Sequence, residues 1–154
     1  MIIAVACDHA GFPMKKVVID AVLSCGHSVL DFGTDSTDPV DYPDYAEKLG
    51  RSIQQGDAAR GILLCGSGVG AAVAANKMRG IRAGVCHDIY SAHQCVEHDN
   101  VNVLALGARI IGPALIRELV CAYLGAVYSQ GERHERRLKK VLALEAMEAQ
   151  GSNP

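Results

Sequence analysis

The stretch "GILLCGSGVGAAVAANK", residues 61–77, joins a short apolar run to a segment of helical length through three glycines at alternate positions. The apolar run fits a strand covered on both faces, as in a parallel sheet. Gly66, Gly68 and Gly70 let backbone N–H groups approach an anion closely, and the helix start that follows adds positive potential. The stretch therefore predicts a strand–loop–helix unit whose loop either binds an anion or makes a tight turn.

The same pattern recurs along the chain. Apolar runs predict strands at 2–7, 28–32, 61–65, 82–86 and 102–106. Amphipathic segments predict helices at 12–25, 43–55, 69–78, 89–97, 113–127 and 132–149. This alternation predicts an α/β fold, a doubly wound five-stranded parallel sheet in a three-layer sandwich with an extra C-terminal helix. We expect one domain over residues 1–150 and a frayed tail at 151–154.

The expected strand order is the flavodoxin-like 2-1-3-4-5, in which ligands bind where strands 1 and 3 end. Asp8 and His9 follow the first strand, and Cys65 closes the third, directly before the glycines. The predicted topology therefore brings two chemically active segments together at one edge of the sheet.

Composition restricts the classes of partner. The 154 residues include 15 basic and 17 acidic side chains, a net charge of −2, which argues against nucleic acid and anionic membrane. The N-terminal apolar run is too short for a signal peptide or a membrane span. The six cysteines form no CxxC pair and mostly lie in apolar runs, so we expect buried, reduced thiols in a cytoplasmic protein.

Cys65 is the first candidate for chemistry. A helix N-terminus favours the thiolate form, which can act as a nucleophile or as a general base. Asp8 and His9 could move hydroxyl protons nearby, or could cap the helix that follows them. Tyr42 could line the same site, or pack on the edge of the sheet.

A second group of candidates is basic. Arg133 and Arg137 in "GERHERRLKK" lie four residues apart on one helix face, so they could bind a single phosphate dianion, with Arg109 as a third contact. A solvated helix face with i,i+4 ion pairs is the alternative.

The sequence also contains features that could indicate a nicotinamide cofactor or a metal ion. "GSGVGA" satisfies G-x-G-x-x-G/A, and Asp88 lies 22 positions after Gly66, so a nicotinamide-dependent oxidoreductase is an alternative. The fingerprint gives Cys65 no role, and its unit comes third in the sheet rather than first. No metal is expected, because no zinc site has the spacing of His87, His93, Cys95 and His98.

In combination, these segments resemble the type B ribose-5-phosphate isomerases, a family that includes isomerases of allose 6-phosphate and galactose 6-phosphate. The matching segments cover nearly the whole chain: "CDHAGF", "DYPDYA", "GILLCGSGVGAAVAANK", "GIRAGVC", "NVLALGARIIG" and "GERHERR". The resemblance implies a cytoplasmic aldose–ketose isomerase, free of metal and cofactor, that interconverts D-ribose 5-phosphate and D-ribulose 5-phosphate in the pentose phosphate pathway. It also implies a homodimer with shared active sites, and leaves open a dimer of dimers.

The resemblance assigns roles to individual residues. Cys65 would carry the proton between C1 and C2 through an enediolate, which the backbone of Gly66 to Gly70, Val69 included, would stabilise. His98, from the second subunit, would open the furanose ring with Asp8 and Ser67. Tyr42 would line the pocket, and four groups would hold the phosphate: His9, Arg109, Arg133 and Arg137.

Two positions depart from the usual pattern of that family. Ser67 stands where threonine is usual and keeps the hydroxyl. Asp99, a predicted sugar contact, stands where asparagine is usual, and an ionised carboxylate cannot donate the hydrogen bond that an amide can. A five-carbon substrate is expected, with a six-carbon sugar phosphate as the alternative. A module that binds a sugar phosphate without turnover is the remaining hypothesis.

Overall fold

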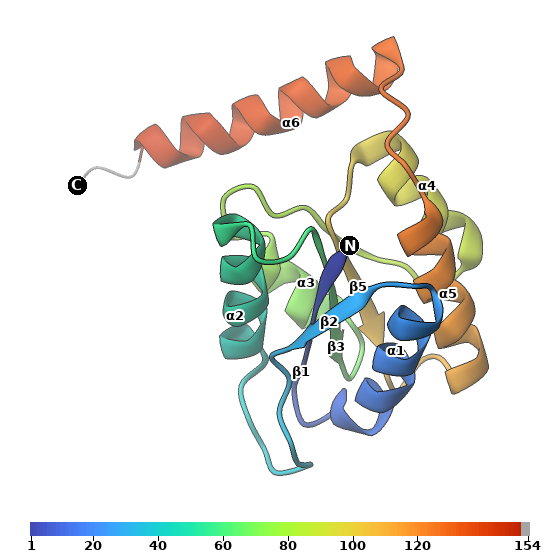
Figure 1. The fold of residues 1–154 in the computed structure, drawn as a ribbon. Coiled ribbons are helices and arrows are strands. Elements are labelled where there is room, and N and C mark those ends of the chain that lie inside the picture. Colours follow the sequence, from blue (N-terminus) through green and yellow to red (C-terminus); the bar gives the residue numbers. More distant parts are fainter. Residues whose placement is uncertain (152–154) are drawn as a thin grey trace.

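The structure is a computed structural model that describes the backbone of residues 1–151 and the side chains of residues 1–148 (Figure 1). Strands and helices alternate from the N-terminus, as the apolar runs predict. The elements are β1 (Ile2–Cys7), α1 (Phe12–Ser24), β2 (Ser28–Asp31), α2 (Tyr42–Gln55), β3 (Arg60–Cys65), α3 (Val69–Ala75), β4 (Ala83–Val85), α4 (Ile89–Asp99), β5 (Val103–Gly107), α5 (Pro113–Gly125) and α6 (Glu132–Gly151).

The sheet is entirely parallel, and its strand order is β2-β1-β3-β5-β4. The doubly wound α/β fold class is confirmed. The predicted order 2-1-3-4-5 is wrong at one end, because β5 turns back and inserts between β3 and β4. The neighbour of β3 on that side is therefore β5, paired so that Cys65 lies opposite Gly107.

Right-handed crossovers then fix the layers. The connections through α2 and α3 run one way across the sheet, and those through α1 and α4 run the other way. Accordingly α2 and α3 pack on one face, whereas α1, α4 and α5 pack on the opposite face (Figure 1). Successive connections leave β1, β3 and β5 toward alternate faces, so the carboxyl end of β3 lies between two switch points, where open α/β sheets bind ligands.

The last helix stands apart from the three layers. α6 lies across the amino-end side of the sheet, with its Glu145 Oε1 accepting a hydrogen bond of 2.8 Å from the Gly80 backbone N–H (Figure 1). Helix α6 continues through Gly151, the first residue of the predicted tail. Residues 152–154 of that predicted tail lie outside the described residues. No helix among the described residues is long and apolar enough to cross a membrane.

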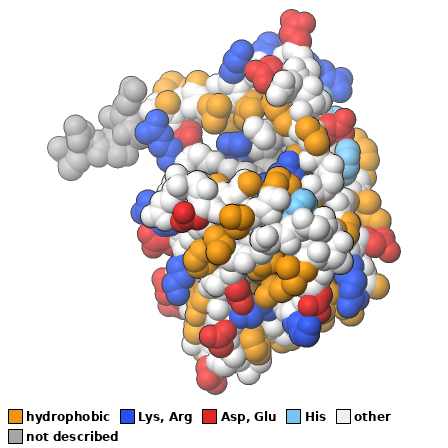
Figure 2. All heavy atoms as spheres, viewed as in Figure 1, with side chains coloured by type: hydrophobic (Ala, Val, Ile, Leu, Met, Phe, Trp, Pro, Cys, Tyr) orange, Lys and Arg blue, Asp and Glu red, His pale blue; other side chains and the backbone are white. Residues whose placement is uncertain are grey.

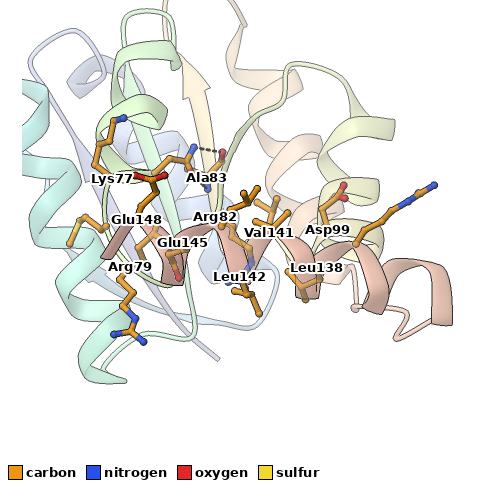
Figure 3. Close-up of a pocket in the computed structure, with 16 residues that line it drawn as sticks. Lys77, Arg79, Arg82, Ala83, Asp99, Leu138, Val141, Leu142, Glu145 and Glu148 are labelled. Carbon is orange, nitrogen blue, oxygen red and sulfur yellow. Dashed lines mark hydrogen bonds between the residues drawn. The ribbon is translucent and has the colours of Figure 1, made fainter. Parts of the chain in front are cut away.

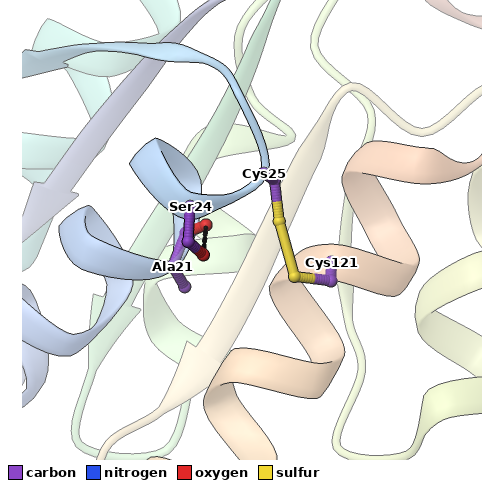
Figure 4. The surroundings of a disulfide bond; sticks show 4 residues. All are labelled: Ala21, Ser24, Cys25 and Cys121. Carbon is purple, nitrogen blue, oxygen red and sulfur yellow. Dashed lines mark hydrogen bonds between the residues drawn. A yellow bond between two sulfur atoms is a disulfide. The ribbon is translucent and has the colours of Figure 1, made fainter.

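The cysteines differ in part from expectation. Cys25, at the end of α1, forms a disulfide with Cys121 of α5, with 6.3 Å between the two Cα atoms (Figure 4). The prediction of reduced thiols is wrong for this pair, because two helices distant in sequence pack side by side and place the two residues within reach. The prediction of buried free thiols is confirmed for the others: Cys7, Cys65, Cys86 and Cys95.

Candidate active site

Cys65 lies at the carboxyl end of β3 and is 5% exposed. Its Sγ accepts a hydrogen bond of 3.1 Å from the backbone N–H of Gly68, the residue that precedes α3. A fixed main-chain donor of this kind stabilises negative charge on sulfur without any rearrangement. The Gly68 N–H therefore points at the sulfur of Cys65, the first candidate for chemistry in the sequence.

Gly68 must be glycine for two reasons. Its φ of +82° is in the left-handed region, and a Cβ there would lie 3.1 Å from the backbone carbon of Leu106 in β5. The loop between β3 and α3 is thus packed directly on the neighbouring strand, which fixes the direction of its N–H groups. Ser67 is exposed on this loop, and its Oγ accepts a hydrogen bond of 3.3 Å from the Val69 N–H.

Arg109 reaches this loop because β5, rather than β4, is the neighbour of β3. The Arg109 N–H donates to the carbonyl of Gly66 at 3.0 Å, and the Ala108 N–H donates to that of Cys65 at 2.9 Å. A Cβ added to Gly66 would lie 3.6 Å from the Arg109 guanidinium nitrogen Nη1. The guanidinium therefore lies beside the predicted anion-binding loop.

Asp8 and His9 follow β1, on the other side of β3. The buried Asp8 carboxylate accepts a hydrogen bond of 2.8 Å from the Gly11 N–H and so holds the turn that leads into α1, but it does not cap that helix, whose N-cap residue is Gly11. His9 Nδ1 lies 3.1 Å from both the carbonyl oxygen and the amide nitrogen of Val40. This contact engages one ring nitrogen and leaves Nε2 as the nitrogen that can bind a ligand.

Tyr42, the first residue of α2, lies over the glycine loop. A Cβ at Gly70 would come within 3.0 Å of the tyrosine Cζ, so the ring rests on the backbone there. Of the two alternatives for this tyrosine, the structure therefore favours a position over the loop. The predicted residues at this edge share one place, the carboxyl ends of β1, β3 and β5: Asp8, His9, Tyr42, Cys65, Gly66, Ser67, Gly68, Val69, Gly70 and Arg109.

The remaining predicted residues lie at the opposite edge. α4 begins after the carboxyl end of β4 and runs back to the amino end of β5. His98 and Asp99 lie in its last turn, so the length of the helix, about 15 Å, separates them from the carboxyl ends of the strands. α6, with Arg133 and Arg137, packs against that end of α4. The His98 ring stacks on His134 of α6, with 4.1 Å between the ring centroids. One copy of the chain therefore separates these residues from Cys65.

A cavity of about 730 Å³ opens beside this second group, between α6 and the amino ends of β4 and β5. Asp99 and Arg137 are among its lining residues, and Val141 and Glu145 of α6 point across it toward Arg82 (Figure 3). Sequence patterns gave no sign of this cavity, because it depends on how α6 turns after α5.

The dinucleotide alternative loses its geometric basis. The Asp88 carboxylate caps α4 by accepting a hydrogen bond of 2.7 Å from the Ser91 N–H, which holds the pKa of that carboxyl below its ordinary value. In addition, β5 lies between β3, which precedes the glycine loop, and β4, which ends near Asp88, whereas the fingerprint needs two adjacent strands. Within residues 1–148, no group of three or more His, Cys, Asp or Glu side chains is arranged to hold a metal ion.

A buried thiol beside a glycine loop, with the Arg109 guanidinium next to that loop at the switch point of a parallel sheet, is the arrangement expected of an α/β enzyme that acts on a small anionic substrate. The chain belongs to the Ribose/Galactose Isomerase family, whose pattern matches residues 3–141. The resemblance seen in the sequence is thereby confirmed.

Individual relatives agree with this assignment. Ribose-5-phosphate isomerase B of Escherichia coli K12 is 43% identical over 143 residues, which cover 93% of this chain and 95% of that protein. D-erythrulose-4-phosphate isomerase of Pectobacterium atrosepticum is 44% identical over 131 residues, or 84% and 86% of the two chains. The structure of the Trypanosoma brucei type B ribose 5-phosphate isomerase is 41% identical, with a TM-score of 0.91 over 93% of this chain and 97% of that one.

Proposed function

We propose that this chain is an aldose–ketose isomerase that interconverts D-ribose 5-phosphate and D-ribulose 5-phosphate. The observation that carries the proposal is the Cys65 thiol, buried at the end of β3 and hydrogen-bonded by the Gly68 N–H. An aldose–ketose isomerase needs one base that returns its proton, donors for an enediolate oxygen and a separate handle for the phosphate.

The geometry gives each requirement a group. The Cys65 thiolate removes the proton from C2 of the open-chain aldose, and the resulting thiol returns it to C1, while the hydroxyl proton on O2 moves to O1. We assign the enediolate oxygen that forms between these steps to the backbone N–H groups of residues 66–70 other than those of Gly68 and Val69, which donate to Cys65 Sγ and Ser67 Oγ. His9 and Arg109 flank the loop as cationic or hydrogen-bonding contacts for the phosphate.

We also propose that the complete site takes residues from two copies of the chain. The family resemblance assigns four further residues to the site, and all lie at the amino ends of the strands, away from Cys65: His98, Asp99, Arg133 and Arg137. A second copy would bring them to the thiol. α6 supports this arrangement, because apolar side chains lie exposed along it (Figure 2), among them Val141, Leu142, Leu144 and Met147. We therefore propose a homodimer in which α6 and the cavity beside it pack against the partner.

The cellular setting follows from the substrate. A phosphorylated sugar carries two negative charges and does not cross a bilayer unaided, so its isomerase belongs in the compartment where the phosphate ester is made. We place the enzyme in the cytoplasm and in the pentose phosphate pathway.

The identity of the sugar has one specific competitor. The D-erythrulose-4-phosphate isomerase is as similar to this chain, at 44% identity, as the ribose-5-phosphate isomerase B, at 43%. Asp99 adds to the question, since a carboxylate replaces a donor at a predicted sugar contact. Values of kcat/KM for four-, five- and six-carbon aldose phosphates rank the candidates, and we expect ribose 5-phosphate to give the highest.

The function is tested by assaying the unmutated protein and Cys65→Ala with ribose 5-phosphate. Loss of the base should lower kcat by about a thousandfold. Cys95→Ala is the matched control, because Cys95 is also a buried free thiol but lies in α4. Equal rates for Cys65→Ala and the unmutated protein would remove this thiol as the base, and an inactive unmutated protein would remove the substrate.

A further inference from the structure

His134 is a buried histidine within the otherwise charged first turns of α6, with only 6% of its surface exposed. The isomerase mechanism described above leaves it without a role. Both of its ring nitrogens are nevertheless engaged: Nδ1 lies 2.7 Å from Ser129 Oγ, and Nε2 lies 2.9 Å from Arg133 Nε. A side chain held at both nitrogens has a defined orientation and a defined proton.

The partners determine the tautomer of this ring. Arg133 Nε always carries a hydrogen and donates it, so His134 Nε2 must be the unprotonated acceptor. Nδ1 then carries the proton and donates it to Ser129 Oγ. Ser129 is itself fixed to the neighbouring helix α4, because its backbone N–H donates to the Glu97 carbonyl at 3.0 Å. The neutral His134 ring is thus tied to α4 on one side and to Arg133 on the other.

The face of the same ring supports His98. The two rings stack with centroids 4.1 Å apart and an angle of 30° between their planes. His98 Nδ1 lies 2.8 Å from Gln94 Nε2, an amide nitrogen that can only donate, so neutral His98 carries its proton on Nε2. That Nε2–H can donate a hydrogen bond to the ring oxygen of a furanose, which takes up a proton as the anomeric hydroxyl loses one and the ring opens.

We propose that neutral His134 is a positioning residue that fixes His98 and Arg133 relative to each other. One buried ring would then hold both the imidazole that opens the sugar ring and the guanidinium that binds the phosphate. The single hydrogen bond from Nε leaves the two terminal nitrogens of Arg133 free to fork onto a phosphate. The inference rests on the proposed function, because it assigns His98 and Arg133 to that reaction.

The surrounding charges keep His134 in the state that this role requires. Burial lowers the pKa of His134, and the nearby His98, Arg133 and Arg137 lower it further, whereas Asp99 acts in the opposite direction. A protonated Nε2 would point a hydrogen at the Arg133 N–H and break that contact. The lowered pKa therefore preserves the acceptor that Arg133 needs.

Two substitutions separate the two contacts. His134→Phe keeps a ring beside His98 but removes the acceptor for Arg133, so we expect KM for ribose 5-phosphate to rise about tenfold with kcat changed less than about twofold. His134→Gln keeps an acceptor near the position of Nε2 but removes the ring. We expect it to lower kcat from aldose to ketose about tenfold, with KM nearly unchanged.

The length of the sugar supplies a readout that a merely structural role would not move. In a four-carbon aldose phosphate the C4 oxygen is esterified, so no hydroxyl can close a five-membered ring and no ring has to be opened. His134→Gln should therefore slow the isomerisation of a four-carbon aldose phosphate much less than that of ribose 5-phosphate, both measured from aldose to ketose. An equal loss with the two substrates would overturn the link between His134 and ring opening.

Controls keep the outcomes distinct. His93→Gln changes a half-exposed histidine of α4 that pairs with Glu97, and it should leave both kinetic constants unchanged. Ser129→Ala removes the hydrogen-bond partner of His134 Nδ1 and should raise KM, as His134→Phe does. If the His134 variants fail to fold, Ser129→Ala tests the positioning role by itself. If the unmutated protein is active and KM is unchanged in both His134→Phe and Ser129→Ala, the positioning role is wrong. If the unmutated protein is inactive, the proposed function fails instead.

Discussion

Gly68 combines two constraints in one residue. Its N–H donates to the catalytic thiol proposed here, and its left-handed backbone lies against β5. The loop can therefore present a donor to sulfur only while no side chain stands between it and the neighbouring strand. This explains why a glycine is needed at this position independently of any ligand.

Gly68→Ala should accordingly affect activity more than stability. We expect a left-handed alanine to cost about 1 to 2 kcal/mol of unfolding free energy, and the shift of the loop away from Leu106 to lower kcat about tenfold or more. Urea unfolding and steady-state kinetics measure the two effects.

The matched control for this substitution is Gly56→Ala. Gly56 has φ +83°, against +82° at Gly68, but an added Cβ there would meet no atom within 4 Å. It should lose similar stability and keep full activity. A Gly68→Ala enzyme with unchanged kcat would contradict the role of this loop.

At the scale of single residues, the sequence predicts candidates from their chemical type and their place at the end of a strand. Cys65, its glycines and Asp8 can be singled out as candidates because each follows an apolar run at the end of a predicted strand, where open α/β sheets bind ligands. Sequence alone assigns no role to His134, since its contacts with Ser129, Arg133 and His98 do not follow from residue spacing. Adjacent residues on a helix do not normally face each other, so the Arg133 contact could not be expected.

Among the elements, the positions of the strands were predicted correctly, but their order was not. The apolar runs nevertheless differ in a way that indicates the observed order. β5 is buried at every position, whereas β4 has three residues, none of them fully buried. A central strand needs an apolar surface on both faces, so the weaker run, with Arg82 before it and Gly84 within it, belongs at the edge.

Asp88 stabilises one element, and its effect should depend on pH. Its folded-state pKa is lowered by the Ser91 N–H, so its contribution is present above the unfolded pKa and is lost as the pH falls through the folded pKa. Asp88→Ala should lower the melting temperature by a few degrees at pH 7, and the difference should shrink as the pH falls through the lowered pKa of this carboxyl. Thermal unfolding of both proteins across this range is the measurement; a difference that persists in acid would exclude the cap as its cause.

The disulfide joins two elements that are 96 residues apart in the chain. Closing a loop of that length should stabilise the oxidised protein by about 4 kcal/mol relative to the reduced one. Thiol titration in denaturant should find four free thiols before reduction and six after it. Cys121→Ser should abolish the difference between oxidising and reducing conditions in urea unfolding, and a variant that keeps that difference would contradict the assignment.

In the whole molecule, the two halves of the proposed site lie at opposite ends of the parallel strands, one at the carboxyl ends and the other at the amino ends. Composition and residue spacing do not reveal this division; in the sequence only the family resemblance predicted it, by assigning His98 to a second subunit. The division follows from the topology: α4 and α6 carry His98 and Arg133 to the amino-end side, whereas β3 ends with Cys65 on the other side. Two copies related by a two-fold axis would form two equivalent sites, each with both halves.

Mixing two inactive variants tests this arrangement directly. In a heterodimer of Cys65→Ala with His98→Ala, one site would carry both substitutions and the other would carry neither. Refolding the two together in equal amounts would make half of the dimers mixed, so activity should recover to about a quarter of the unmutated level. A mixture of Cys65→Ala with Cys65→Ser leaves no intact site and should stay inactive. If dimers that are shown to be mixed recover no activity above the separate variants, Cys65 and His98 do not share a site across the interface.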